Sequence, residues 1–253
     1  MRPKNIEISQ HNDEIQQNAK SWAKKPLLQK AYGQFYEAIK EHIDPKTGGM
    51  IVELGSGLGN IKKHIPDCVI TDLFPNPWID RVESAYKLSF SDNSISHLIL
   101  FDVWHHLEYP VNALKEAHRV LAPGGKLIIM EPAMSVLGRI VYGKFHHEPL
   151  GLELKINDTS ATNEQIQRAG YFAAQGSAYR VFVLKEVPQI LNDWDMCDLK
   201  KITSLSYWAT GGFSGPVLCP RFLEPLMVLI DRICSFFPNV FAARLLIVLS
   251  KKD

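Results

Sequence analysis

Three glycines at alternate positions follow a short apolar run and an acidic residue within residues 50–60, which read MIVELGSGLGN. Glycine permits positive φ angles and has no Cβ, so this spacing predicts a buried strand that enters a tight loop whose backbone closely approaches a ligand. The acidic residue is Glu53, two positions before the first glycine. A carboxylate there favours a ligand with a cationic or amine group over a pyrophosphate.

Asn60 argues against the loop of a nicotinamide-dependent oxidoreductase. The dinucleotide-binding pattern G-x-G-x-x-G would place its third glycine at position 60, where this chain has asparagine. A nicotinamide-dependent oxidoreductase therefore stays an alternative with weaker support.

Four further segments follow the glycine loop at regular intervals. A short strand pattern ends at Asp72, residues 85–94 read AYKLSFSDNS, residues 97–107 read HLILFDVWHHL, and residues 114–129 read LKEAHRVLAPGGKLII. In this order, the five segments resemble the class I S-adenosylmethionine-dependent methyltransferases, of the small-molecule, methyltransferase-11-like type. The resemblance covers about residues 50–132.

The resemblance implies an α/β fold with a doubly wound, mostly parallel, seven-stranded sheet of the Rossmann-like methyltransferase kind. It implies S-adenosyl-L-methionine as cofactor and S-adenosyl-L-homocysteine as product. In this family the carboxylate at the position of Asp72 hydrogen-bonds the ribose hydroxyls. The cofactor-binding residues that the resemblance implies are Glu53, Gly55, Ser56, Gly57, Gly59, Asn60, Asp72, Leu73, Ala85, Phe101 and Asp102.

The adenine side of the expected cofactor site departs from the family pattern. Many members carry an acidic residue just before the alanine at position 85, and this chain has Ser84 there. We therefore expect adenine to be held by backbone groups near Ala85 and by the apolar walls Leu73 and Phe101.

Two pairs of histidines are the candidates for a general base. Methyl transfer mainly requires that the nucleophile be held in line about 3 Å from the methyl group, and a base is needed only where the nucleophile must lose a proton. Histidine suits that task because its unperturbed pKa lies near neutrality. We select His105 and His146 over their neighbours His106 and His147, although each pair could equally be a helix start or an exposed loop.

The favoured reaction is O-methylation of a sugar, a polyol or an aromatic metabolite. Adjacent helical residues face about 100° apart, so we expect His106 to point away from His105. We predict no metal, because no second carboxylate stands at metal-ligand spacing from Asp102. A non-catalytic S-adenosylmethionine-binding partner or sensor is the alternative outside enzymes.

The chain divides into four parts of a single methyltransferase domain that spans residues 1–253. Residues 12–44 predict N-terminal helices, and residues 49–132 alternate strand and helix as the cofactor-binding core. Residues 133–216 are too long for an ordinary connection and predict an inserted cover over the substrate. Residues 217–253 predict a helix and a last strand.

Composition narrows the partners and the compartment. The net charge is +1, so the chain lacks the basic excess of a nucleic-acid-binding protein, and we expect a small-molecule acceptor instead. The four cysteines form no C-x-x-C pair, which is typical of reduced thiols in the cytoplasm. Residues 1–18 lack the apolar core of a signal peptide, and a cytoplasmic location is the expectation.

The apolar tail over residues 222–249 is interrupted by charged side chains and Pro238, which argues against a membrane-spanning helix. We expect a core helix followed by a buried strand. Contact of an amphipathic helix with a membrane surface stays open, and the oligomeric state is not indicated.

Overall fold

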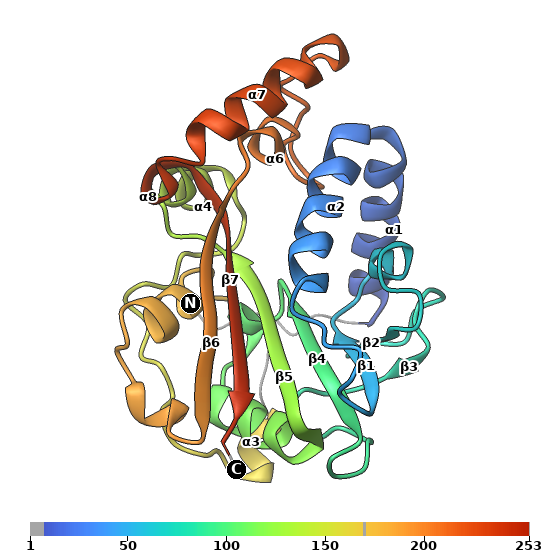
Figure 1. Cartoon of the computed structure of the whole chain (residues 1–253), viewed down its shortest axis with the longest axis vertical. Coiled ribbons are helices and arrows are strands. Elements are labelled where there is room, and N and C mark those ends of the chain that lie inside the picture. The colour runs from blue at the N-terminus through green and yellow to red at the C-terminus, as the bar shows by residue number, and fades with distance from the viewer. Residues whose placement is uncertain (1–7, 169–170, 253) are drawn as a thin grey trace.

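The computed structural model of the chain describes residues 8–168 and 171–252. Its centre is one seven-stranded sheet with the strand order β3-β2-β1-β4-β5-β7-β6 (Figure 1). The β3-β2-β1-β4-β5 pairings are parallel, and β7 runs antiparallel to both β5 and β6, so the predicted mostly parallel seven-stranded sheet is confirmed. The strands are β1 (Met50–Leu54), β2 (Val69–Asp72), β3 (Arg81–Val82), β4 (Ile95–Phe101), β5 (Leu121–Pro132), β6 (Trp194–Thr203) and β7 (Ala242–Lys251).

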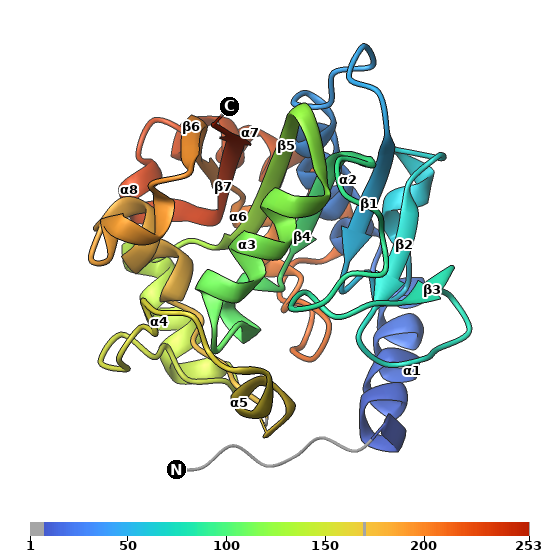
Figure 2. The same ribbon diagram turned by 90° about the horizontal axis from the view of Figure 1, so that it is seen from below.

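Helices cover both faces of the sheet (Figures 1 and 2). The α-helices are α1 (Ile8–Lys24), α2 (Pro26–Lys40), α3 (Pro110–Val120), α4 (Val136–Phe145), α5 (Asn163–Arg168), α6 (Leu205–Ala209), α7 (Glu224–Cys234) and α8 (Pro238–Phe241). Short helical turns are η1 (Asn60–Lys63), η2 (Trp104–His106), η3 (Tyr179–Val183), η4 (Pro188–Leu191) and η5 (Arg221–Leu223).

Strand β4 is buried at every position, as a central parallel strand covered on both faces must be. Leu98 and Leu100 belong to the apolar core that includes residues of α3, whereas Ile99 and Phe101 belong to the core that includes residues of α2. This alternation follows from the two-residue period of a strand. The sheet thus separates two cores, one under each helical layer.

Parts of the sequence-based prediction need correction. The cofactor-binding core does not alternate strand and helix throughout: β1 and β2 are joined only by the turn η1, because the connection over residues 55–68 is short. Residues 133–216 are not wholly a cover, since β6 lies within them and is a strand of the main sheet. Pro26 begins α2, at a position where its missing N–H costs nothing.

The carboxyl ends of β1, β4 and β5 lie at the upper edge of the sheet in Figure 1, and α6 and α7 lie beyond this edge. The four cysteines are free thiols. Among the described residues, no helix is both long enough and apolar enough to cross a bilayer.

Candidate active site

The glycine loop after β1 has two packed glycines and one open one. Gly55, Gly57 and Gly59 all have positive φ angles, of 64°, 51° and 64°. A Cβ on Gly55 would collide with the side chain of Val103, and one on Gly59 would collide with Ile70. No atom lies within 4 Å of a Cβ built on Gly57. The loop therefore packs on its outer glycines and leaves its middle one open for the close approach of a ligand.

Ser56 and Asn60 shape this loop. The Ser56 hydroxyl donates to the backbone oxygen of Glu53 at 3.1 Å and accepts from the backbone N–H of Thr71, also at 3.1 Å. Asn60 is the first residue of η1, directly after the left-handed Gly59. Ser56 therefore joins the end of β1 to β2.

Asp72 ends β2 next to the open glycine. Its carboxylate accepts from the backbone N–H of Gly57 at 3.1 Å and from that of Leu73 at 2.7 Å. The Leu73 side chain is exposed. These two hydrogen bonds from backbone N–H groups fix the Asp72 carboxylate at the rim of the glycine loop, where the resemblance places the ribose hydroxyls.

Glu53 has a buried carboxyl group with an oxygen, Oε2, that no described residue hydrogen-bonds. Burial raises the pKa of Glu53 to about 8, and the charge of Asp72 adds to this while the hydrogen bond from Ser56 opposes it. A buried carboxylate oxygen without a partner is costly. A cationic amino group bound beside it would remove that cost.

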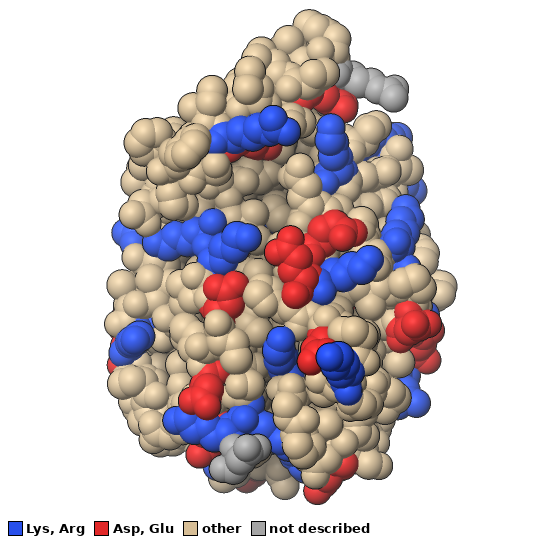
Figure 3. All heavy atoms as spheres, in the orientation of Figure 1, with Lys and Arg blue, Asp and Glu red and all other residues tan. Residues whose placement is uncertain are grey.

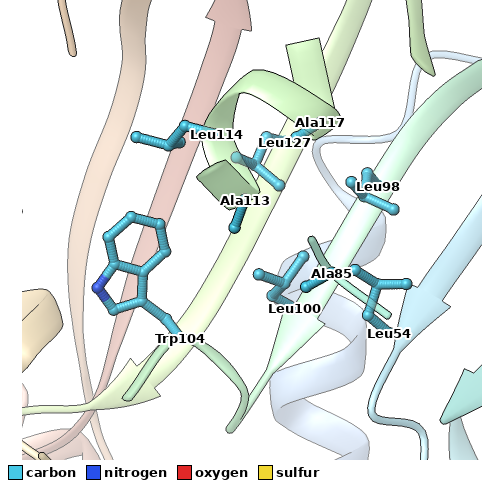
Figure 4. A pocket seen from close by; sticks show the side chains of 9 residues that line it. All are labelled: Leu54, Ala85, Leu98, Leu100, Trp104, Ala113, Leu114, Ala117 and Leu127. Carbon is cyan, nitrogen blue, oxygen red and sulfur yellow. The ribbon is translucent and has the colours of Figure 1, made fainter. Parts of the chain in front are cut away.

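Two residues that were predicted on the adenine side, Ala85 and Phe101, lie on different faces of the sheet. Ala85 packs against the core under α3, whereas the Phe101 ring lies on the other face of the sheet, with its centroid 5.2 Å from that of Tyr32. Ala85 also lines a small cavity beneath α3 together with side chains such as Leu54 and Trp104 (Figure 4). Because leucine, alanine and tryptophan side chains line this cavity, it is a gap in core packing and lacks the polar groups that a nucleoside requires.

Asp102 is held by a buried arginine. A guanidinium N–H of Arg244, on β7, donates to the Asp102 carboxylate, and Nη2 donates to the Tyr207 hydroxyl at 3.0 Å. The same guanidinium lies over the rings of Phe101 and Tyr207, 5.3 and 4.9 Å from their centroids. The ion pair thus fixes the start of the loop after β4, where Asp102 has a positive φ of 58°.

His105 is buried between two carboxylates. Its Nδ1 lies 2.7 Å from Glu131 Oε2, and its Nε2 lies 3.5 Å from Glu148 Oε2. Burial alone would lower the pKa of His105, but the two carboxylates outweigh it and raise the pKa to about 10. At neutral pH this side chain is therefore an imidazolium, which has no lone pair to accept a proton.

Glu148 is the hub of a larger polar cluster. Its carboxylate accepts from the Tyr171 hydroxyl and the Gln175 amide, and lies 3.8 Å from His106 Nε2 and 3.9 Å from His146 Nδ1. Burial would raise the pKa of Glu148, but the neighbouring imidazolium outweighs this and lowers it to about 2. Glu148 is therefore ionised at every physiological pH.

His106 and His146 are neutral and differ in their tautomers. His106 Nδ1 donates to the Phe172 carbonyl at 2.9 Å, which leaves Nε2 without a proton. Burial, together with the charge of His105, lowers the pKa of His106 to about 4. His146 Nδ1 instead accepts from the Glu148 N–H at 3.2 Å, so its proton sits on Nε2, and burial lowers its pKa. Of these two residues, only His106 has an unprotonated ring nitrogen that accepts no hydrogen bond from the described residues.

The expectation that His106 points away from His105 is wrong. Both residues lie in the single turn η2, and their rings lie against each other with centroids 4.0 Å apart. Both Nε2 atoms face Glu148. The His105 imidazolium is attracted to this carboxylate, and the short turn η2 places the ring of His106 beside it.

Three of these residues also have metal-ligand spacing. His105, His106 and Glu148 offer ligand atoms that all lie within 4.8 Å of one another. The positive charge on His105 acts against a cation there, so the prediction that the enzyme uses no metal stays a prediction.

Sequence reasoning missed Glu131, Glu148 and Arg244. Each had a signal: Glu131 and Arg244 are charged residues within or next to apolar runs of strands, and Glu148 directly follows a pair of histidines. A charge in an apolar strand is costly unless it is paired. That principle predicts a partner for each of them, but it does not say which.

Comparison with known proteins also indicates a methyltransferase domain. Residues 52–129 match the family model Methyltransf_11, described as a methyltransferase domain. The fold resembles that of geranyl diphosphate C-methyltransferase from Streptomyces coelicolor A3(2), with a TM-score of 0.51 and 10% identity over 87% of this chain and 76% of that chain. A geranyl diphosphate methyltransferase in complex with GPP and sinefungin gives a TM-score of 0.50 and 12% identity, over 87% of this chain and 78% of that chain.

A possible histamine N-methyltransferase from Thermotoga maritima gives a TM-score of 0.47 and 17% identity, over 86% of this chain and 87% of that chain. No curated protein sequence matches the chain. The region that contains the glycine loop matches a methyltransferase domain, which favours a methyltransferase over the nicotinamide-dependent oxidoreductase that was the alternative.

The geometry of the glycine loop generates a prediction about cofactor affinity. Asp72→Ala removes a charged acceptor at the rim of the loop, and we expect it to weaken S-adenosylhomocysteine binding by about 1.5 to 3 kcal/mol. This corresponds to a roughly 10- to 150-fold higher Kd in titration calorimetry. Asp67→Ala, at an exposed acid just before β2, is the matched control and should bind normally. Equal affinities for both variants would remove Asp72 from the site.

The buried charges around His105 generate a prediction about stability. His105→Ala leaves two buried carboxylates without their cation, and we expect a loss of about 3 to 5 kcal/mol in the free energy of unfolding in urea. His147→Ala, at a side chain that is 72% exposed, is the control.

The pH dependence has a definite sign. Because folding raises the pKa of His105, its contribution is fully present below the unfolded value of about 6.5 and is lost as pH rises through about 10. The wild-type free energy of unfolding should therefore fall between pH 7 and 10.5, more steeply than that of His105→Gln. Parallel curves for the two proteins would contradict the assignment.

Proposed function

We propose that this chain, which carries a class I S-adenosylmethionine-dependent methyltransferase domain, methylates a hydroxyl oxygen of a small molecule such as a sugar, a polyol or an aromatic compound. The acceptor would enter at the edge of the sheet where β4 and β5 end. His106, on the loop leaving β4, would be the group that accepts its proton.

The residues around the glycine loop fit the cofactor. Glu53 would pair with the cationic amino group of the cofactor, and Asp72 would accept hydrogen bonds from its ribose hydroxyls. The open face of Gly57 would leave room for the part of the cofactor that joins these two groups. When bound, the cofactor supplies an electrophilic sulfonium methyl group. Gly55 packs on Val103, so the glycine loop is in direct contact with the loop that carries the histidines.

The observation that carries the proposal is the unprotonated Nε2 of His106. Its Nδ1 proton is committed to the Phe172 carbonyl, and its side chain is 34% exposed. Its low pKa of about 4 keeps Nε2 unprotonated but also makes it a weak base, because a general base is most effective when its pKa lies near the working pH. A general base must be unprotonated at working pH and reachable by the acceptor. In the transfer His106 Nε2 would take up the proton of the acceptor hydroxyl, and the bound cofactor would supply the methyl group that replaces this proton on the oxygen.

His105 would then be a positioning residue. Its imidazolium holds Glu148 in place and helps to keep His106 neutral, since the charge of His105 lowers the pKa of its neighbour. As His106 takes up a proton, the carboxylate of Glu148, 3.8 Å away, would stabilise the new positive charge.

The structure therefore shifts the sequence-based choice of base. As a base, His105 would first have to give up a proton that two carboxylates hold. His146 presents Nε2–H, a donor, because its Nδ1 accepts from the backbone. Catalytic roles for these two residues stay predictions, and His106 becomes the first candidate.

We expect His106→Ala to lower kcat by about 10² to 10⁴ with nearly unchanged S-adenosylhomocysteine affinity. The assay is mass spectrometry of methylated products with a panel of hydroxyl compounds and a metabolite extract. The His147→Ala variant should keep wild-type turnover. Wild-type turnover in His106→Ala would refute the assignment, and a protein that makes no product with any acceptor would favour a non-catalytic cofactor-binding role.

The pH profile separates His106 from an ordinary histidine. The base form of His106 exists above its pKa of about 4, so kcat should stay level as pH falls from 8 to 5. An unperturbed imidazole would lose half of its base form near pH 6.5. Loss of half the activity near that pH would point to a different base.

A further inference from the structure

An apolar stripe faces solvent along η5 and α7 and reaches Phe236, two residues beyond the end of α7. Five large side chains recur every three or four residues, which places them on one face of a helix. Their exposed fractions run from 48% to 81%. The stripe consists of Phe222, Leu226, Leu229, Ile233 and Phe236.

The acidic side chain in the middle of α7 is turned away from this stripe. The Asp231 carboxylate accepts from the backbone N–H of Ser206 at 3.1 Å and from its hydroxyl at 2.5 Å. Its neighbour Arg232 is exposed. The other acid of the helix, Glu224, is in its first turn and is only partly exposed. The centre and the end of the stripe are therefore bordered by a basic residue and by no free acid.

Helix α4 carries a second group of exposed apolar residues, Val136, Ile140 and Phe145. The charged residues of this helix are Arg139 and Lys144, both exposed, and residues 133–147 contain no acid. Helix α4 packs against α8, which follows α7 in the chain. The helices lie at the same end of the molecule (Figure 1), and the tip that α7 forms is mostly free of charged side chains (Figure 3).

This apolar and basic end is connected to the active site. Helix α6 packs against α7, and Tyr207 of α6 accepts a hydrogen bond from Arg244, the residue that holds Asp102. A surface bound to α7 would therefore lie close to the edge of the sheet at which an acceptor enters.

We propose that α7 and α4 dock the enzyme on an anionic lipid bilayer, with the two helices lying in the bilayer interface. Exposed large apolar side chains flanked by basic residues are the chemistry that such an interface recognises. Pairing of two copies through the same face would bring Arg232, Arg139 and Lys144 of both copies close together, and few acids are there to oppose them. Phosphate headgroups supply that opposing charge.

The test is co-sedimentation of the full chain with vesicles of phosphatidylcholine and phosphatidylglycerol, mixed three to one. We expect binding that weakens as salt is raised, and an at least tenfold lower partition coefficient for Leu229→Asp with Ile233→Asp. Leu184→Asp, at an exposed apolar residue after η3, is the matched control and should bind as wild type does. Circular dichroism and S-adenosylhomocysteine calorimetry verify that each variant is folded.

Three results would overturn the proposal. They are failure of the wild type to bind these vesicles, equal binding by the stripe variant, and equal binding to vesicles of phosphatidylcholine alone. Ultracentrifugation that shows a dimer which the stripe variant dissolves, without vesicle binding, would assign the face to a second copy. The docking surface is independent of the proposed methyl transfer, because calorimetry and turnover on a water-soluble acceptor test that function without a membrane.

Discussion

The candidate active site depends on one buried cation. The imidazolium of His105 lies between Glu131, at the end of β5, and Glu148, beyond α4, so it ties the loop after β4 to two other segments. Two buried carboxylates without a cation would be strongly destabilising, and His105 removes that cost. The arrangement then fixes Glu148, which in turn sets the neighbourhood of His106. The buried charges of His105, Glu131 and Glu148 thus determine that His105 is protonated and that His106 is neutral.

A second ion pair, between a buried arginine and a partly exposed aspartate, holds the same loop from the other side. Arg244 binds Asp102 from β7, and aromatic rings on α6 and β4 surround its guanidinium. Between the two charged anchors, Val103 packs on Gly55 and so couples the loop to the glycine turn. The glycine loop and the loop that carries the histidines are therefore in contact at one edge of the sheet, which suits a reaction that depends on accurate positioning.

The sequence predicted those features of the site that depend on residues close together in the chain. The positive φ angles of Gly55, Gly57 and Gly59, and the position of Asp72 beside them, follow from a strand, a tight turn and the next strand. The partner of Asp102 could not be predicted in this way, because Arg244 lies 142 residues along the chain. Protonation was also beyond a sequence pattern: His105 and His106 are adjacent, yet burial among different neighbours moves their pKa values in opposite directions.

The protonation state of His105 tests the account most directly. Long-range ¹H–¹⁵N correlation spectra of the ¹⁵N-labelled protein distinguish an imidazolium from either neutral tautomer, and His105→Gln identifies the His105 signals. We expect both ring nitrogens of His105 to carry protons at pH 8, and His106 to be protonated only on Nδ1. A neutral His105 at pH 7 would contradict the charge balance on which the site depends.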